Sequence, residues 1–139
     1  MLNKLILTSL LLLSLVIPNG LRANGLIEAK HGLRYKVLAP GEGMTAAPGK
    51  IATIHFSIWE DNDSEKGGKI FDSREEGMPV SFKIGTKKFL EGLNIGVNSM
   101  KVGEMRRMYI PSHIDPSKDN SEFPDNVDLI FEVELLEIR

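Results

Sequence analysis

The chain has 139 residues, with 17 basic and 19 acidic side chains, a formal net charge of −2 and no cysteine. Without cysteine, disulfides, thiol nucleophiles and thiolate metal sites are excluded. Nucleic-acid binding normally needs a basic stripe, so the slight acidic excess indicates no nucleic-acid partner.

The first 23 residues have the features of a secretory signal. Lys4 precedes the apolar run Leu5–Ile17, and the segment ends at Ala23, a small residue that suits a signal peptidase. As a helix this run would reach about 20 Å, against roughly 30 Å of bilayer hydrocarbon. We therefore expect a signal peptide over residues 1–23 and an exported protein, periplasmic or secreted, in a bacterial envelope. The alternative is an uncut N-terminal anchor, which would be the only contact with a membrane.

Cleavage after Ala23 leaves 116 residues, the size of one domain. We expect residues 24–45 to form an N-terminal leader with a short strand at Tyr35–Leu38. Residues 24–34 are polar and are expected to dock loosely. Residues 46–139 are expected to form the functional domain.

Alternating apolar and polar residues predict strands in several parts of the chain. The clearest examples place β-branched or aromatic residues at every second position. They are Lys50–Glu60, Met78–Ile84, Glu104–Ile110 and Val127–Ile138. In the third of these, Arg106 and Arg107 are adjacent, so they are expected on opposite faces of the sheet.

Residues 86–96 change to a helical period. Thr86 suits the start of a helix and Gly96 suits its end. The apolar residues of this segment share one helical face: Phe89, Leu90 and Leu93. Because the sheet must cover its apolar face, this short helix is the expected cover. The predicted fold is therefore α+β, an antiparallel β-sheet wrapped on one short α-helix.

Two loops are expected between these elements. Asp61–Lys69 is charged and contains glycine, which is typical of a solvated loop. Ser112–Asn126 contains proline and has a length that usually serves a function or gives mobility.

Metal-dependent and hydrolytic chemistry find no support in the residue spacing. The three histidines are far apart in the sequence, and the acids of Glu60–Asp63 lack the ligand spacing of a calcium loop. No serine lies in a nucleophile elbow or beside an arranged base. We expect neither a metal site nor a cofactor.

Six motifs follow one another along the chain. They are GLRYKVLAPGEG, PGKIATIHFSIWE, KIFDS, PVSFKIG, FLEGLNIGVNSMKVGEMRRMYIP and DLIFEVELLEI. Their order resembles that of the FKBP-type peptidyl-prolyl isomerases over roughly residues 33–139. The resemblance implies a curved antiparallel sheet around a short helix. It also implies an isomerase that interconverts cis and trans X-Pro bonds of proline-containing polypeptide clients without a cofactor.

The resemblance also implies the site residues. Phe71 and Asp72, the Phe-Asp pair of the FDS motif, would be catalytic. Phe71 is expected to pack on the proline ring. Asp72 is expected to accept a hydrogen bond from the bound backbone or to hold a neighbouring side chain in place. The implied substrate-binding residues are apolar: Phe56, Val80, Phe89, Leu90, Leu93 and Phe131.

The chain departs from the family pattern at several positions. Phe56 stands in place of a tyrosine, Val80 in place of a phenylalanine and Leu93 in place of a tryptophan. Residues 112–120 contain neither the tyrosine nor the glycine that the family has after its Ile-Pro. These losses favour an alternative function, a non-catalytic module of the same fold that binds apolar peptide segments.

The residues alone allow simpler interpretations. Without the resemblance, the phenylalanines are ordinary core residues of a small sheet domain. The alternative for Asp72 is a surface ion pair with one of three arginines, which are Arg74, Arg106 and Arg107. Such a pair would contribute little to stability.

Overall fold

The computed structural model describes residues 25–86, 90–114 and 123–139. In this part of the chain the longest strand is β3 (Ile51–Asn62). Its alternate residues are apolar and buried, from Ala52 to Ile58. It pairs antiparallel with β4 (Glu65–Asp72) and β5 (Val80–Lys83) on one side and with β7 (Leu129–Ile138) on the other.

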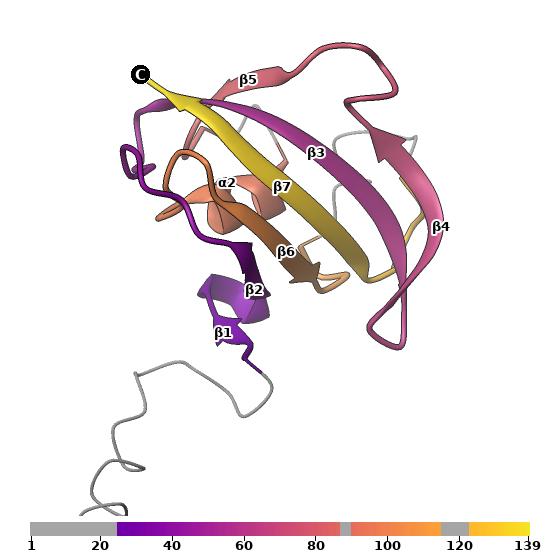
Figure 1. Ribbon diagram of the computed structural model, residues 1–139. Coiled ribbons are helices and arrows are strands. Elements are labelled where there is room, and N and C mark those ends of the chain that lie inside the picture. The colour runs from indigo at the N-terminus through magenta and orange to yellow at the C-terminus, as the bar shows by residue number, and fades with distance from the viewer. Residues whose placement is uncertain (1–24, 87–89, 115–122) are drawn as a thin grey trace, which may run out of the picture.

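The sheet continues from β7 to the N-terminal strands. β7 pairs with β6 (Met105–Ile110), β6 with β2 (Arg34–Ala39), and β2 with β1 (Ile27–Glu28). All pairs are antiparallel, in the order β1-β2-β6-β7-β3-β4 with β5 on β3. The sheet curves around one side of helix α2 (Glu91–Val97) (Figure 1). The predicted α+β fold is confirmed.

The core lies between the curved sheet and helix α2. Leu93 and Val97 of the helix join the buried side chains of the inner sheet face. The approach is close, because a Cβ atom on Gly92 would lie 2.6 Å from Cδ1 of Ile110. A Cβ on Gly96 would overlap the sulfur of Met108. Glycine at these two positions therefore lets the helix sit directly on β6.

The helix begins and ends later than the sequence predicts. It begins at Glu91 with Leu90 as N-cap, so the prediction that Thr86 caps it is wrong. The Thr86 hydroxyl instead donates to the Lys83 carbonyl at 2.9 Å. The prediction that Gly96 ends the helix is also wrong, since Gly96 lies inside it. The close approach of Gly96 to Met108 explains why glycine occupies this position.

The expected loop at Asp61–Lys69 is mostly strand. β3 and β4 extend into it and meet in a tight turn at Asp63 and Ser64, whose φ angles are 51° and 69°. Positive φ at both central residues is typical of two-residue hairpin turns. Asn62 pairs with Glu65 across this turn. The charged side chains are exposed there. The composition of the segment thus predicts its exposure to solvent correctly, but it does not show that the backbone is paired in a hairpin.

The N-terminal segment docks more firmly than expected. It contains β1 and the short 3-10 helix η1 (Lys30–Gly32). Leu33 is fully buried in the core and Leu26 is also buried. The expectation of loose docking is therefore wrong for these residues, because two leucines anchor the segment. The expected signal peptide lies outside the described residues, as do residues 115–122 of the long loop.

Candidate active site

Three of the predicted phenylalanines form one aromatic cluster. The ring centroids of Phe56 and Phe71 are 4.9 Å apart, and those of Phe56 and Phe131 are 6.3 Å apart and stacked. Phe56 and Phe131 are buried, whereas Phe71 is partly exposed. Across β3, Ile58 pairs with Phe71 on one side and with Phe131 on the other. The register of three strands therefore builds an apolar base that ends at the surface in Phe71.

The other apolar residues of the predicted site surround this base to different extents. Val80 pairs with Ile54 of β3 and is partly exposed. Leu90, the N-cap of α2, is partly exposed and packs against the core, and Leu93 is fully buried in it. Phe89 lies outside the described residues, so its place in the site stays a prediction.

Asp72 lies on the other face of the sheet from Phe71. It pairs with Ser57, whose side chain alternates with those of Phe56 and Ile58 in the core. Its Oδ2 accepts from the Lys69 ammonium at 3.1 Å, and its Oδ1 accepts from the Arg74 backbone N–H at 3.0 Å. Both oxygens thus have partners in the protein, and the bond to Arg74 fixes the turn after β4.

The charge of Asp72 is stabilised where it lies. Burial acts most strongly on the Asp72 pKa and tends to raise it. The Lys69 ammonium, the Arg74 N–H and the Ser57 hydroxyl together outweigh burial, and they hold the pKa below the ordinary value of 3.8. Its carboxylate is therefore ionised at neutral pH. An ionised carboxylate can hold neighbouring donor groups in place by accepting hydrogen bonds, but it cannot donate a proton.

None of the three arginines forms the ion pair considered for Asp72. Arg74 pairs with Glu134, Arg106 with Glu104 and Arg107 with Glu132. The partner of Asp72 is Lys69, which also binds Glu75 at 2.8 Å. That interpretation is wrong because a register shift in β4, between the pairs Ile58–Phe71 and Trp59–Lys69, brings Lys69 over the same face.

Ser73 supports the aromatic cluster from behind. It is fully buried, and its hydroxyl oxygen accepts from the Phe56 N–H at 2.9 Å. The hydroxyl also bonds to Nδ1 of His55 at 2.9 Å. Ser73 is not among the predicted site residues. The signal for its structural role is its place directly after Phe71-Asp72, opposite the His55-Phe56 pair.

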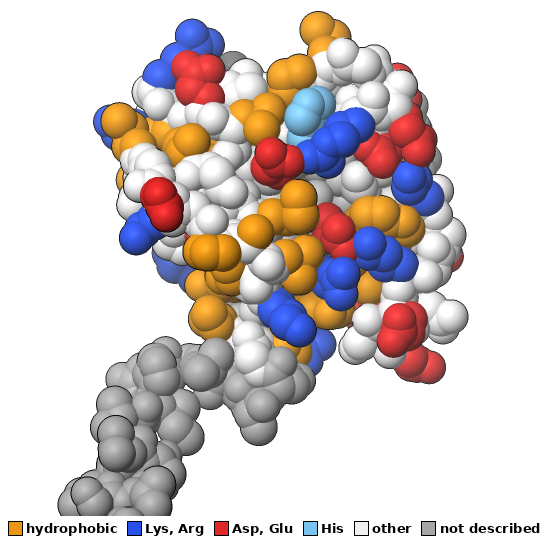
Figure 2. All heavy atoms as spheres, viewed as in Figure 1, with side chains coloured by type: hydrophobic (Ala, Val, Ile, Leu, Met, Phe, Trp, Pro, Cys, Tyr) orange, Lys and Arg blue, Asp and Glu red, His pale blue; other side chains and the backbone are white. Residues whose placement is uncertain are grey.

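The outer face of the sheet is charged. Figure 2 shows Lys, Arg, Asp and Glu side chains of both signs interspersed over β3, β6 and β7. Two acids of β7 organise this face: Glu132 binds Lys66 and Arg107, and Glu134 binds Arg74. The Lys66 ammonium also lies 4.2 Å from the centre of the Trp59 ring. Basic groups here are paired with acids, so they do not form a basic stripe.

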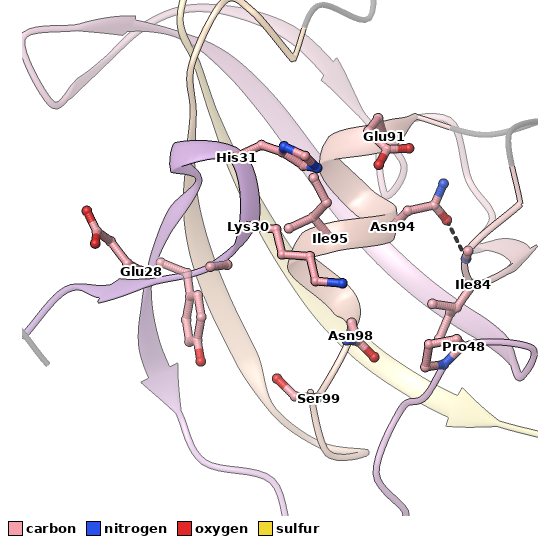
Figure 3. Close-up of a pocket in the computed structure, with 13 residues that line it drawn as sticks. Glu28, Lys30, His31, Pro48, Ile84, Glu91, Asn94, Ile95, Asn98 and Ser99 are labelled. Carbon is pink, nitrogen blue, oxygen red and sulfur yellow. Dashed lines mark hydrogen bonds between the residues drawn. The ribbon is translucent and has the colours of Figure 1, made fainter. Parts of the chain in front are cut away.

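A separate cavity of about 410 Å³ lies beside helix α2. It contains none of the predicted site residues and is lined by the N-terminal segment, by Pro48 and the end of β5, and by one face of α2 (Figure 3). That face carries Glu91, Asn94 and Ile95 and points away from Leu93. Helix α2 thus separates this cavity from the side that carries Leu93.

Residues 25–86, 90–114 and 123–139 show neither a metal-binding group of side chains nor a membrane-spanning helix. In these ranges no three or more His, Asp or Glu side chains are grouped so that they can hold a metal ion. No helix among them is long and apolar enough to cross a membrane.

Comparison with known proteins supports the family resemblance seen in the sequence. Residues 42–136 match the family model of the FKBP-type peptidyl-prolyl cis-trans isomerases. FK506-binding protein 4 of Emericella nidulans is 40% identical over 100 residues, which are 71% of this chain and 20% of that protein. FK506-binding protein 4 of Gibberella zeae is 43% identical over 114 residues, which are 81% of this chain and 22% of that protein. The chain thus spans about a fifth of the length of these relatives.

Two solved structures share the fold. FkpA from Escherichia coli has a TM-score of 0.72 at 24% identity, over 85% of this chain and 53% of the other. AtFKBP13 has a TM-score of 0.67 at 22% identity, over 82% of this chain and 98% of the other. With the family model matched over residues 42–136 and the aromatic cluster built from the family's own motif positions, this chain belongs to the FKBP-type peptidyl-prolyl cis-trans isomerase family.

Proposed function

We propose that the chain accelerates the cis-trans isomerisation of X-Pro bonds in polypeptide clients. The observation that supports this most is the partly exposed Phe71 ring, whose centroid lies 4.9 Å from that of the buried Phe56 ring, at the surface end of the aromatic cluster. In this proposal the proline ring of the client packs on Phe71.

The chemistry needs no nucleophile, metal ion or cofactor. Rotation about the peptide bond is opposed by about 18–20 kcal/mol, because resonance gives the C–N bond double-bond character. The planar amide is more charge-separated than the twisted transition state. An apolar aromatic surface therefore disfavours the planar form relative to the twisted one, which lowers the barrier.

Asp72 has an orienting role in this proposal. Its bonds to Lys69 and to the Arg74 N–H hold the end of β4, and Phe71 is the residue immediately before it. Because the carboxylate lies on the sheet face opposite Phe71, a hydrogen bond to it from the bound client backbone is not part of this proposal. No proton transfer is involved.

A test of the proposed activity compares the wild-type chain with Phe71→Ala and Asp72→Ala in a protease-coupled assay on a proline-containing peptide. We expect turnover above the buffer rate for the wild type and a loss in both variants. If all three match the buffer rate, the proposed activity is wrong.

The second candidate is a binding module without useful turnover. Two observations favour it. Val80 and Leu93 stand where the family pattern has aromatic residues, and Leu93 is fully buried. The site therefore exposes less aromatic surface to a client than the family pattern implies. This candidate predicts that the chain suppresses the aggregation of an unfolded client while its isomerase rate equals that of buffer. Absence of client protection would count against it.

We also propose that the protein is exported, with residues 1–23 as signal peptide, residues 24–45 as leader and residues 46–139 as isomerase domain. The support is the apolar run Leu5–Ile17 and the small residue Ala23. Expression in a bacterial host followed by fractionation and N-terminal sequencing tests it. Envelope material that starts at Asn24 is expected, whereas an uncut chain in the cytoplasm would contradict export.

A further inference from the structure

Helix α2 depends on contacts outside itself for its position. It has only seven residues, two of them glycines, and no side chain caps its N-terminus. A helix of this length has little stability of its own in water. Because Leu90 and Leu93 are brought to the proposed site by this helix, the contacts that position it also position them.

Asn94 makes such a contact on the side of the helix that lines the cavity. Its side chain is 7% exposed. Its Oδ1 accepts from the Gly85 N–H at 2.9 Å (Figure 3). Its Nδ2 donates to the Thr86 carbonyl at 2.8 Å. The two partners require one acceptor and one donor at adjacent positions, which an amide supplies and a carboxylate or an alkyl group does not.

The turn that Asn94 binds is itself attached to the sheet. Gly85 has a φ of 88°, and the Thr86 N–H bonds to the Lys83 carbonyl at 3.4 Å, which is the pattern of a tight turn with glycine at its third position. Ile84, within this turn, bonds to Lys50 and Gly49 through its backbone, each at 2.9 Å. Asn94 therefore connects the helix to a fixed point at the end of β5.

We propose that Asn94 is a positioning residue for the isomerase site. It joins the turn at Gly85 and Thr86 to the helix, whose N-cap is the predicted site residue Leu90. The inference rests on the proposed function. In this inference the side-chain amide of Asn94 sets the position of Leu90 relative to the aromatic cluster. The position of Leu90 in turn affects the affinity for a proline peptide.

The chain offers a matched control at Asn98. It lies four residues further along, as the C-cap of the same helix, and lines the same cavity. In the described residues, Asn98 contributes only its backbone carbonyl to a hydrogen bond, with Arg106. The Asn98→Leu variant makes the same chemical change as Asn94→Leu without removing a side-chain hydrogen bond.

The experiment uses the 139-residue chain and the variants Asn94→Leu, Asn94→Asp and Asn98→Leu. Isomerase kinetics give kcat and KM, and NMR titration with a proline-containing peptide gives Kd. NMR also gives the hydrogen-exchange rate of the Gly85 amide and the Leu90 methyl shifts. Asn94→Asp keeps the acceptor for Gly85 and loses only the donor, so it retains part of the contact if Asn94→Leu does not fold.

We expect kcat/KM to fall about tenfold in Asn94→Leu, mainly through KM, and about threefold in Asn94→Asp. Exchange of the Gly85 amide should accelerate in Asn94→Leu and stay slow in Asn94→Asp, while Asn98→Leu should match the wild type throughout. Equal kinetics, peptide affinity and Leu90 shifts in Asn94→Leu and Asn98→Leu would overturn the inference.

The two proposals fail in different ways. A wild-type chain that binds the peptide without turnover would refute the proposed activity, and the peptide Kd of the variants would then decide on Asn94. Normal turnover in Asn94→Leu with a fast-exchanging Gly85 amide would refute the positioning role alone. A chain that neither binds nor isomerises the peptide would refute both.

Discussion

Arg106 and Arg107 are neighbours on β6, but they lie in opposite environments. Arg106 faces the core and is 3% exposed. It donates to Glu104 at 2.6 Å and to the Gly96 carbonyl at 3.1 Å, with its guanidinium 3.9 Å from the centre of the Tyr35 ring. Arg107 faces outward with 31% of its side chain exposed and shares Glu132 with Lys66.

The difference between the two arginines shows that the inner and outer faces of the sheet place different demands on polar side chains. On the inner face Arg106 has fixed partners, and it links Tyr35 of β2, the end of helix α2 and Glu104. On the outer face water can replace a lost partner. Strand β4 repeats the division at the proposed site, because Phe71 joins the inner aromatic cluster and Asp72 belongs to the outer charged face.

The largest expected effect is the loss of stability in Arg106→Met. This change leaves the buried Glu104 without its ionic partner and the carbonyl of Gly96 without a donor. We expect the free energy of unfolding to fall by about 3–5 kcal/mol, as measured by urea denaturation. The outer-face control, Arg107→Met, should cost less than about 1 kcal/mol. Equal losses would contradict the contrast between the faces.

Phe71→Ala should affect activity more than any change on the outer face. Removal of the ring takes away the surface on which the proline is proposed to pack, and we expect kcat/KM to fall about 30-fold, or about 2 kcal/mol. Steady-state isomerase kinetics measure this. A fall of similar size in Arg107→Met would show that the effect is not specific to the inner face.

Ser73→Ala tests the contact that holds the aromatic cluster from behind. The substitution leaves the buried Phe56 N–H without its acceptor, so we expect a loss of about 1–2 kcal/mol in the free energy of unfolding. Ser81→Ala is the matched control, since Ser81 is exposed and its hydroxyl bonds to the Thr53 hydroxyl at 2.8 Å. Thermal denaturation of both variants gives the comparison, and an unchanged Tm in Ser73→Ala would refute the role.

The smallest effect should come from Asp72→Asn, and it should depend on pH. The pKa of Asp72 is lowered in the folded state, so its charge stabilises the fold above the ordinary value of 3.8. This stabilisation is lost as the pH falls through the folded pKa. The wild type should therefore be slightly more stable than Asp72→Asn at pH 6, and the gap should close toward pH 2. A gap that widens in acid would mean that the pKa is raised.

Much of the fold follows from local sequence, because the period of two in β3, β6 and β7 reports which face is buried. The ends of elements do not follow in the same way. Leu90 begins the helix without a capping side chain, so tertiary packing sets that boundary. The hairpin at Asp63 and Ser64 depends on positive φ angles, which the polar composition of this segment does not predict.

The site was predictable in part for similar reasons. Motif order identifies Phe56, Phe71 and Phe131 as candidates, and the strand register brings their rings together. The partner of Asp72 depends on a register that composition does not reveal. The role of Asn94 could not be predicted, because its partners are backbone groups eight and nine residues upstream, which a turn brings next to the helix.

The most direct test of the central claim is an NMR exchange measurement of the cis and trans populations of a proline peptide. We expect faster interconversion with the wild-type chain than in buffer, a large loss with Phe71→Ala and an unchanged rate with Arg107→Met. Interconversion at the buffer rate with the wild-type chain, or at the full rate with Phe71→Ala, would contradict it.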